Sequence, residues 1–139
     1  MKIVLDTNIL VGACMGSYPA NRLLAACLQG KLTPLIGAAL LTEYEDVLNR
    51  TSLFSGSKLN LSERNEVLDA LLSVCEWTRI YYLWRPNLRD EADNHLLELA
   101  IAGNADFLVT RNLKDFTQAQ LLFARPEICL PETLLEKLP

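Results

Sequence analysis

Short apolar runs alternate with longer amphipathic stretches along most of the chain. The runs at residues 2–6, 32–36, 78–84, 107–110 and 128–130 have the length of β-strands and are apolar on both faces. Such strands are typical of a parallel sheet covered by helices on two sides, whereas a strand with one solvated face would alternate apolar and polar residues. The pattern therefore predicts a parallel sheet of four to five strands.

The stretches between these runs place apolar residues on one side of a helix, and caps or helix stops mark their ends. The predicted boundaries are Ser17 with Pro19 and Gly30 for the first helix, residues 38–50 for the second, Ser62 for the start of the third, Asp90 or Asp93 with Gly103 for the fourth, and Pro131 for the start of the last. This alternation indicates the α/β class, with helices on both faces of the sheet. Because no repeat or linker interrupts the 139 residues, we expect one domain over residues 1–139.

The composition is that of a soluble globular protein, with half of the residues hydrophobic and 22% charged. The net charge of -4 argues against a protein that binds nucleic acid through an overall positive field, so a phosphate ligand would need local charge neutralisation. The four cysteines include no C-x-x-C pair and read as free thiols in a reducing compartment. No apolar run approaches the ~20 residues of a membrane span, and we expect a cytoplasmic protein.

Acidic and polar residues stand where several predicted strands end. Sites in open α/β sheets form outside the carboxyl ends of the strands, so these positions are the informative ones. Asp6 closes the first strand, and Thr7 and Asn8 can hydrogen-bond the backbone of the following turn and thereby orient its carboxylate. The alternative is that Asp6 only caps a helix.

Asp93 lies three and four residues before Leu96 and Leu97, which places it above the helix face that packs on the sheet. Asp90 is about one turn earlier on that face, and one of the two aspartates is expected to cap the helix. The carboxylate of Asp93 is therefore predicted to reach the same rim as Asp6.

Two further segments supply acids by position. Glu43 and Glu45 lie equally far from the centre of an apolar helix stripe, so helical geometry does not choose between them. The strand at 107–110 ends in Thr110 and is followed by Asn112 and Asp115, where Asp115 serves the site or only forms a turn. His95 is two residues from Asp93, and we expect it at the surface on another side of the helix.

Four segments together resemble the PIN-domain nucleases, and among them the toxin components of bacterial and archaeal toxin-antitoxin pairs. They are "VLDTNIL", "LLTEYEDVL", "RDEADNHLLELAIAGNADFLVTRNLKDF" and "ICLPETLL", which extend over nearly the whole chain. The resemblance implies a PIN-like domain with four acidic residues that bind Mg²⁺ or Mn²⁺, two ions per site, and hydrolyse RNA. It also implies an antitoxin protein as a partner.

The resemblance assigns roles position by position. Asp6 and Asp93 match the two central metal ligands of the family, and Glu43 rather than Glu45 matches its glutamate. Many relatives have aspartate where this chain has Asn112, and Asp115 is expected to take that role. The other polar residues near the acids are expected to support them or to contact RNA phosphates. The supporting residues are Thr7, Asn8, Asp90, Thr110 and Asn112, and the phosphate contacts are Arg89, Arg111 and Lys114.

Two alternatives compete with a nuclease. A metal-dependent phosphatase would also place an aspartate after the first strand, but "LDTN" has no second aspartate two residues on. The other alternative is a PIN-like module that has lost one metal ligand at Asn112 and only binds a partner. The aromatic-rich run "CEWTRIYYLW" has more large rings than one strand buries, and we expect it to contribute to a homodimer.

Overall fold

Five parallel strands form one sheet in the order β3-β2-β1-β4-β5 in the computed structural model, which describes residues 1–80 and 91–138 and only the backbone of residues 91–94, 118 and 121. The strands are β1 (Lys2–Leu5), β2 (Thr33–Ile36), β3 (Glu76–Trp77), β4 (Phe107–Val109) and β5 (Glu127–Cys129). All four neighbouring pairs are parallel. The predicted α/β class and the parallel sheet are confirmed.

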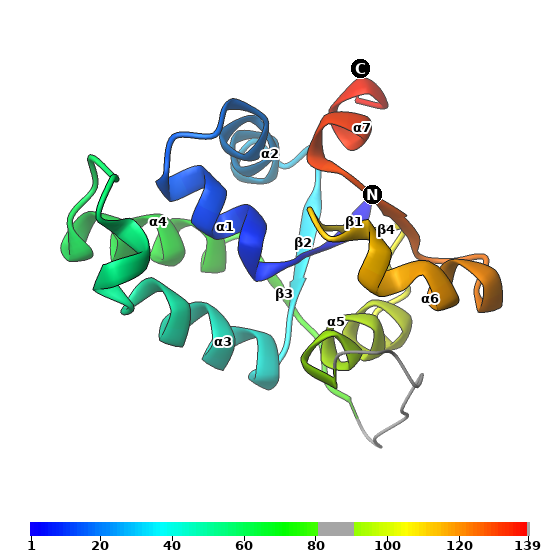
Figure 1. Ribbon diagram of the computed structural model, residues 1–139. Coiled ribbons are helices and arrows are strands. Elements are labelled where there is room, and N and C mark those ends of the chain that lie inside the picture. Colours follow the sequence, from blue (N-terminus) through cyan, green and yellow to red (C-terminus); the bar gives the residue numbers. More distant parts are fainter. Residues whose placement is uncertain (81–90, 139) are drawn as a thin grey trace.

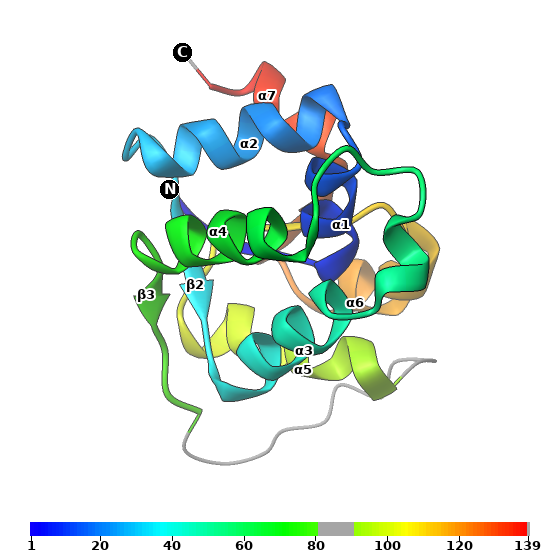
Figure 2. The same ribbon diagram turned by 90° about the vertical axis from the view of Figure 1, so that its left-hand side faces the viewer.

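Helices connect each strand to the next, and a last helix follows β5. They are α1 (Thr7–Cys14), α2 (Tyr18–Leu28), α3 (Ala38–Leu48), α4 (Leu61–Leu72), α5 (Glu91–Ala102), α6 (Thr117–Leu122) and α7 (Pro131–Glu136), with short 3₁₀ helices η1 (Thr51–Phe54) and η2 (Leu113–Phe116). Helices α1 to α4 lie on one side of the sheet, and α5 and α6 lie on the other (Figure 1, Figure 2). The prediction of helices on both faces is also confirmed.

The order of the strands places β1 at the centre of the sheet. From β1 the chain moves outward to β2 and β3, and it then returns across β1 to β4 and β5. Right-handed crossovers in opposite directions put the connecting helices on opposite faces. The connections diverge beside the carboxyl end of β1, and this divergence is where open α/β sheets form a crevice for a ligand.

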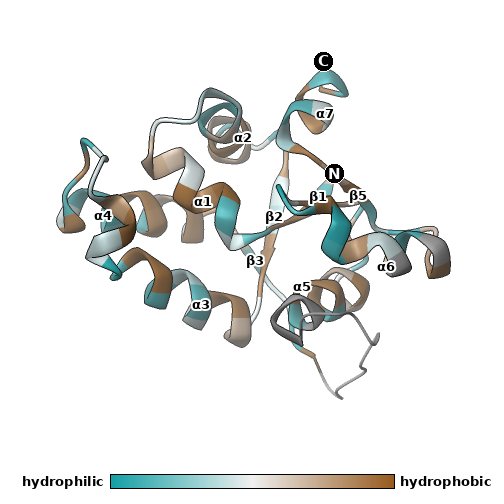
Figure 3. Ribbon diagram, viewed as in Figure 1, coloured by the Kyte–Doolittle hydropathy of each residue, from teal (hydrophilic) through white to brown (hydrophobic). Residues whose placement is uncertain are grey.

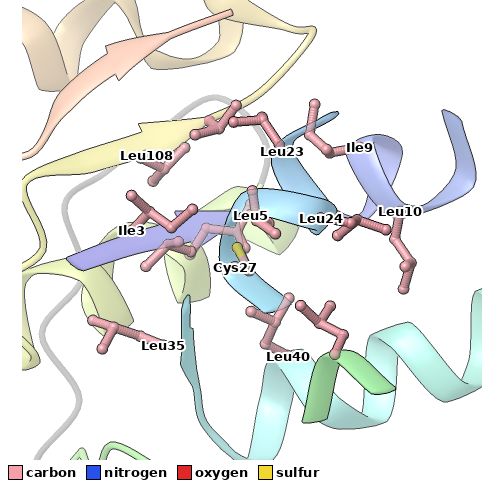
Figure 4. Packing of buried hydrophobic residues seen from close by; sticks show 14 of the residues in the cluster. Ile3, Leu5, Ile9, Leu10, Leu23, Leu24, Cys27, Leu35, Leu40 and Leu108 are labelled. Carbon is pink, nitrogen blue, oxygen red and sulfur yellow. The ribbon is translucent and has the colours of Figure 1, made fainter. Parts of the chain in front are cut away.

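The core surrounds β1 on both faces. Ile3, Val4 and Leu5 are at most 1% exposed. Figure 4 shows Ile3 and Leu5 among side chains from neighbouring elements, including Leu23 of α2 and Leu108 of β4. Along the helices, hydrophobic and hydrophilic stretches alternate, as expected where one side of each helix packs inward (Figure 3). Burial on both faces fixes β1 firmly, and with it the position of the residue that follows.

The strand predicted at residues 78–84 begins two residues too late. Strand β3 is Glu76–Trp77, and residues 78–80 form no strand, although Thr78 N–H still donates to the Ile36 carbonyl at 2.8 Å. Residues 81–84 lie outside the described residues. An apolar run marks burial, but the residues that pair at a sheet edge depend on the register with β2, which pairs Leu35 with Glu76.

One predicted helix cap was also wrong, and of the two alternatives for another only one can be tested. Asn60, not Ser62, caps α4: its Oδ1 accepts from the Glu63 N–H at 2.9 Å, and Glu63 Oε1 accepts from the Asn60 N–H at 3.0 Å. This reciprocal pair satisfies two N–H donors at the start of the helix. A cap at Ser62 would not form this pair. Asp93 lies inside the first turn of α5 and does not cap it, and Asp90 lies outside the described residues.

Two helices were not predicted. Helix α1 follows β1 after a single residue, so Thr7 and Asn8 begin a helix and not a turn. Its apolar residues continue the apolar run of the strand, which hides the boundary from periodicity. Helix α6 is only six residues long, and a segment of that length carries too few periods to be recognised.

Candidate active site

The carboxyl ends of β1 and β4 bring two polar side chains together. Leu5 pairs with Val109 in the sheet, so Asp6 and Thr110 follow the two strands at the same level, and the Asp6 N–H donates to the Val109 carbonyl at 2.9 Å. The Thr110 hydroxyl donates to Asp6 Oδ2 at 2.7 Å, and both residues are buried. Sheet register therefore joins residues that are 104 positions apart.

Asp6 occupies the N-cap position of α1, but its side chain makes no capping hydrogen bond. Its carboxylate instead accepts from Thr110 and, at 3.4 Å, from Asn8 Nδ2. The side chain is directed along the sheet edge although the residue is only 7% exposed. The bond to Thr110 after another strand argues against the alternative in which Asp6 serves only as a cap.

A small network fixes the polar groups around Asp6. The Thr110 hydroxyl, which donates to Asp6, accepts from the Asn112 N–H at 3.0 Å. Asn8 Oδ1 accepts from the Arg111 N–H at 3.4 Å. The turn after β4 thus holds both Thr110 and Asn8. Asn112 takes part through its backbone, and its side chain is exposed.

Helix α3 is tied to the end of β1 by its tyrosine. The Tyr44 hydroxyl donates to the Leu5 carbonyl at 2.6 Å, and Tyr44 is 1% exposed. This bond sets the neighbouring Glu43, which is half-buried, next to the residue that follows Leu5. Glu45 points away and is exposed. Helical spacing did not distinguish the two glutamates. The packing of Tyr44 places Glu43, and not Glu45, beside Asp6.

Replacing Tyr44 by phenylalanine is expected to lower the free energy of unfolding by about 1–2 kcal/mol, because it removes a buried hydrogen bond without creating a large cavity. Urea denaturation followed by circular dichroism measures the change. The matched control is Tyr18→Phe, where the ring is 71% exposed and the effect should stay within about 0.5 kcal/mol. Equal effects of the two substitutions would contradict the importance of this bond.

The surroundings of Asp6 and Glu43 shift the pKa values of the two carboxyl groups in opposite directions. Burial raises the pKa of Asp6, and the nearby Glu43 carboxylate raises it as well, while the bond from Thr110 opposes the shift. The pKa of Glu43 is lowered, chiefly by the hydrogen bond from His95 and also by the Thr7 hydroxyl, against the effect of its partial burial. Two carboxylates are thus held close together, and the buried one resists ionisation.

The surface position expected for His95 was wrong. Its Nε2 lies 2.5 Å from Glu43 Oε2, and its side chain is only 18% exposed. Spacing along one helix cannot reveal a partner on another helix, and the crossing of α3 and α5 decides this contact. The signal that could have found it is the position of His95 directly before Leu96 and Leu97, both buried against the sheet.

A sequence model described as the PIN domain matches residues 2–114. The chain belongs to the PIN-domain family. Its fold is similar to a chain of the crystal structure of VapBC2 from Rickettsia felis bound to a DNA fragment from their promoter, with a TM-score of 0.57 and 22% identity. The similarity covers 93% of this chain and 97% of that chain. Among curated proteins, none matches this PIN domain.

The structure describes some of the remaining predicted site residues of this PIN domain and not others. Asp93 lies in the first turn of α5, where only the backbone is described, and Arg89 and Asp90 lie outside the described residues. Asp115 lies in η2 and is half-buried. Among the described side chains, no group of three His, Cys, Asp or Glu residues is arranged to hold a metal ion. Asp6 and Glu43 are thus the acids that the described residues bring together.

The two basic residues after β4 differ in their surroundings. Arg111 forms an ion pair with Glu132 of α7, with both side chains partly exposed. Lys114 is exposed. Both follow Thr110 closely and lie at the rim of the PIN-domain site. None of the helices in residues 1–80 and 91–138 has the length and hydropathy of a membrane span.

The polar groups of the PIN domain at this edge fit a divalent cation. Asp6 and Glu43 offer carboxylate oxygens, which Mg²⁺ and Mn²⁺ prefer as ligands. The buried Thr7 hydroxyl lies close enough to Glu43 to lower its pKa as a hydrogen-bond donor. A cation would offset the repulsion between the two carboxylates.

Proposed function

We propose that this PIN domain is a metal-dependent endoribonuclease and the toxin of a toxin-antitoxin pair. The observation that carries the proposal is the buried Asp6 carboxylate, which is not used for capping and is held beside Glu43 at the carboxyl end of the central strand. A buried acid with a raised pKa next to a second acid is costly for the fold, and such pairs are found at functional sites.

Asp6, Glu43, Asp93 and Asp115 are the residues that would hold Mg²⁺ or Mn²⁺, two ions per site. Bound ions would supply Lewis-acid chemistry: they lower the pKa of water and neutralise the charge of a phosphodiester. The chain's own polar groups orient the ligands. Thr110 holds one oxygen of Asp6, and Asn8 contacts the same oxygen.

Charge explains how an acidic protein can act on RNA. Four carboxylates repel a phosphate, whereas two divalent cations would cancel their charge, so metal and substrate binding are coupled. Arg111, Lys114 and Arg89 are proposed to contact phosphates on either side of the scissile one. For Arg111 this requires exchange of its Glu132 carboxylate for a phosphate, and both are anionic partners at the surface.

An antitoxin protein and a second copy of the chain are the proposed partners. The fold similarity to a chain of VapBC2 supports an antitoxin partner. For the homodimer, the support is Trp77 on edge strand β3, which is 55% exposed. Large exposed rings at a sheet edge are typical of interfaces.

Incubation of a mixed RNA pool with the metal-free protein and added Mn²⁺ tests the function. The wild type should cleave RNA and leave 5′-phosphate and 3′-hydroxyl ends, and Asp93→Asn should not. Cleavage that persists in chelator, or equal cleavage by both proteins, would refute a metal-dependent activity. Calorimetry that detects no Mn²⁺ binding at millimolar concentration would favour the second candidate, a binding module that has lost its activity at Asn112.

Substitutions at positions 115 and 112 test which of the two residues contributes to the site. Asp115→Asn is expected to reduce Mn²⁺-dependent cleavage by about 10²-fold, because it removes one charge from the site without altering the backbone of η2. Asn112→Asp should increase cleavage or leave it unchanged. Rates on a fluorescent RNA substrate measure both effects. Unchanged cleavage by Asp115→Asn would show that this residue is only a turn former.

A further inference from the structure

Helices α3 and α5 are linked by one polar contact that the proposed chemistry does not require. His95 Nε2 on α5 lies 2.5 Å from Glu43 Oε2 on α3. The two helices lie side by side in both views of the chain (Figure 1, Figure 2). His95 is the sole histidine of the sequence, and its side chain is 18% exposed against 32% for Glu43. The imidazole is therefore the more buried partner.

The chemistry of the two groups fixes the direction of the bond. An ionised carboxylate can only accept hydrogen bonds, so Nε2 carries the hydrogen and donates it to Glu43. The other ring nitrogen, Nδ1, is buried and has no hydrogen-bond partner among the described residues. In the described part of the chain, the contact that His95 makes through its ring nitrogens is therefore the one with Glu43. His95 thus acts on its surroundings through Glu43.

Glu43 needs such a restraint. A glutamate has three side-chain torsions, and this one is partly exposed, so its carboxylate can rotate into solvent. The like charge of Asp6 favours that rotation, because it repels the Glu43 carboxylate. Tyr44 fixes the helix backbone beside Glu43 but not the glutamate side chain. The imidazole holds Glu43 Oε2 and opposes the rotation, and its hydrogen bond lowers the pKa of Glu43 more than that of the Thr7 hydroxyl does.

We propose that His95 is a positioning residue of the acidic site: it holds Glu43 Oε2 so that the Glu43 carboxylate stays beside Asp6 in the geometry that binds a divalent cation. The inference rests on the proposed function, because it concerns the same site. Groups that hydrogen-bond a metal-ligating carboxylate typically change metal affinity by 10–100-fold when they are removed.

Calorimetric titration of the metal-free protein with Mn²⁺ tests the proposal without relying on cleavage. His95→Leu is expected to weaken Mn²⁺ binding by about 10-fold or more, because leucine cannot donate. His95→Gln should recover most of the affinity, since the glutamine Nε2 donates from a similar reach. Glu45→Gln, an exposed change on the same helix, is the matched control and should bind as the wild type does.

The outcomes separate this proposal from the proposed function. If the wild type and His95→Leu bind Mn²⁺ with the same affinity, the positioning role is refuted and the metal-dependent function stands. If His95→Gln binds as weakly as His95→Leu, the loss comes from packing and not from the donor, and the role is again refuted. If the wild type binds no Mn²⁺, the metal-dependent function fails, and the positioning role fails with it.

A second measurement covers the case in which His95→Leu does not fold. The imidazole nitrogens of the sole histidine give unambiguous ¹⁵N resonances in the metal-free protein at a fixed pH. We expect an Nε2 signal of a hydrogen-bonded donor, which Glu43→Gln shifts and Glu45→Gln leaves in place. A signal that does not respond to Glu43→Gln would overturn the proposal.

Discussion

Replacing Asp6 by asparagine is expected to reduce Mn²⁺-dependent RNA cleavage by on the order of 10³-fold, the scale on which loss of one preorganised charged group acts at an active site. Asparagine keeps the shape of the side chain and can still accept from the Thr110 hydroxyl. The substitution therefore removes a negative charge and little else. Single-turnover rates on a defined RNA with saturating Mn²⁺ measure the effect.

The control for this prediction is Asp46→Asn. Asp46 is on the solvent side of α3 and forms only a surface ion pair with Arg50, which contributes little to stability. Asp46→Asn removes one negative charge from the chain, as Asp6→Asn does, so any effect of net charge on RNA binding appears in both variants. Residual cleavage by Asp6→Asn within about 10-fold of the control would be inconsistent with a metal ligand at position 6.

The second large effect concerns stability without and with metal. In chelator, Asp6→Asn should unfold at the same temperature as the wild type or higher, because the wild type must keep a buried carboxylate beside Glu43. With Mn²⁺ at about 100 times its dissociation constant, the wild type alone should gain about 2.7 kcal/mol, or roughly 9 °C for a chain of this length. Differential scanning calorimetry measures both states.

The stability difference between Asp6→Asn and the wild type in chelator should depend on pH, and the pKa of Asp6 determines its direction. The pKa of Asp6 in the folded protein is raised above its ordinary value of 3.8, so the folded state binds this proton more tightly than the unfolded chain does. Ionised Asp6 therefore destabilises the metal-free fold at neutral pH, and the penalty decreases as pH falls through the raised pKa. The advantage of Asp6→Asn in chelator should be largest near pH 7 and should disappear only when the pH falls below the ordinary pKa of 3.8. A clearly less stable Asp6→Asn protein would instead indicate a structural role for this carboxylate.

The class of fold could be predicted because burial leaves a direct record in the sequence. Residues 3–5 are apolar without alternation, which is typical of a strand covered on both faces, as β1 is. The placement of Asp6 at a strand end followed from the same pattern. The boundary between β1 and α1 could not be predicted, because the apolar run continues from strand to helix with a single residue between them.

The sequence by itself determined that the chain alternates strands and helices and that Asp6 and Thr110 end two of the strands. Only the tertiary structure decided that these two residues are hydrogen-bonded, that Glu43 lies near Asp6, and that His95 contacts Glu43. The physical reason is that periodicity reports which side of an element is buried, whereas contacts between elements depend on sheet register and helix crossing. Both are set by packing across the whole core.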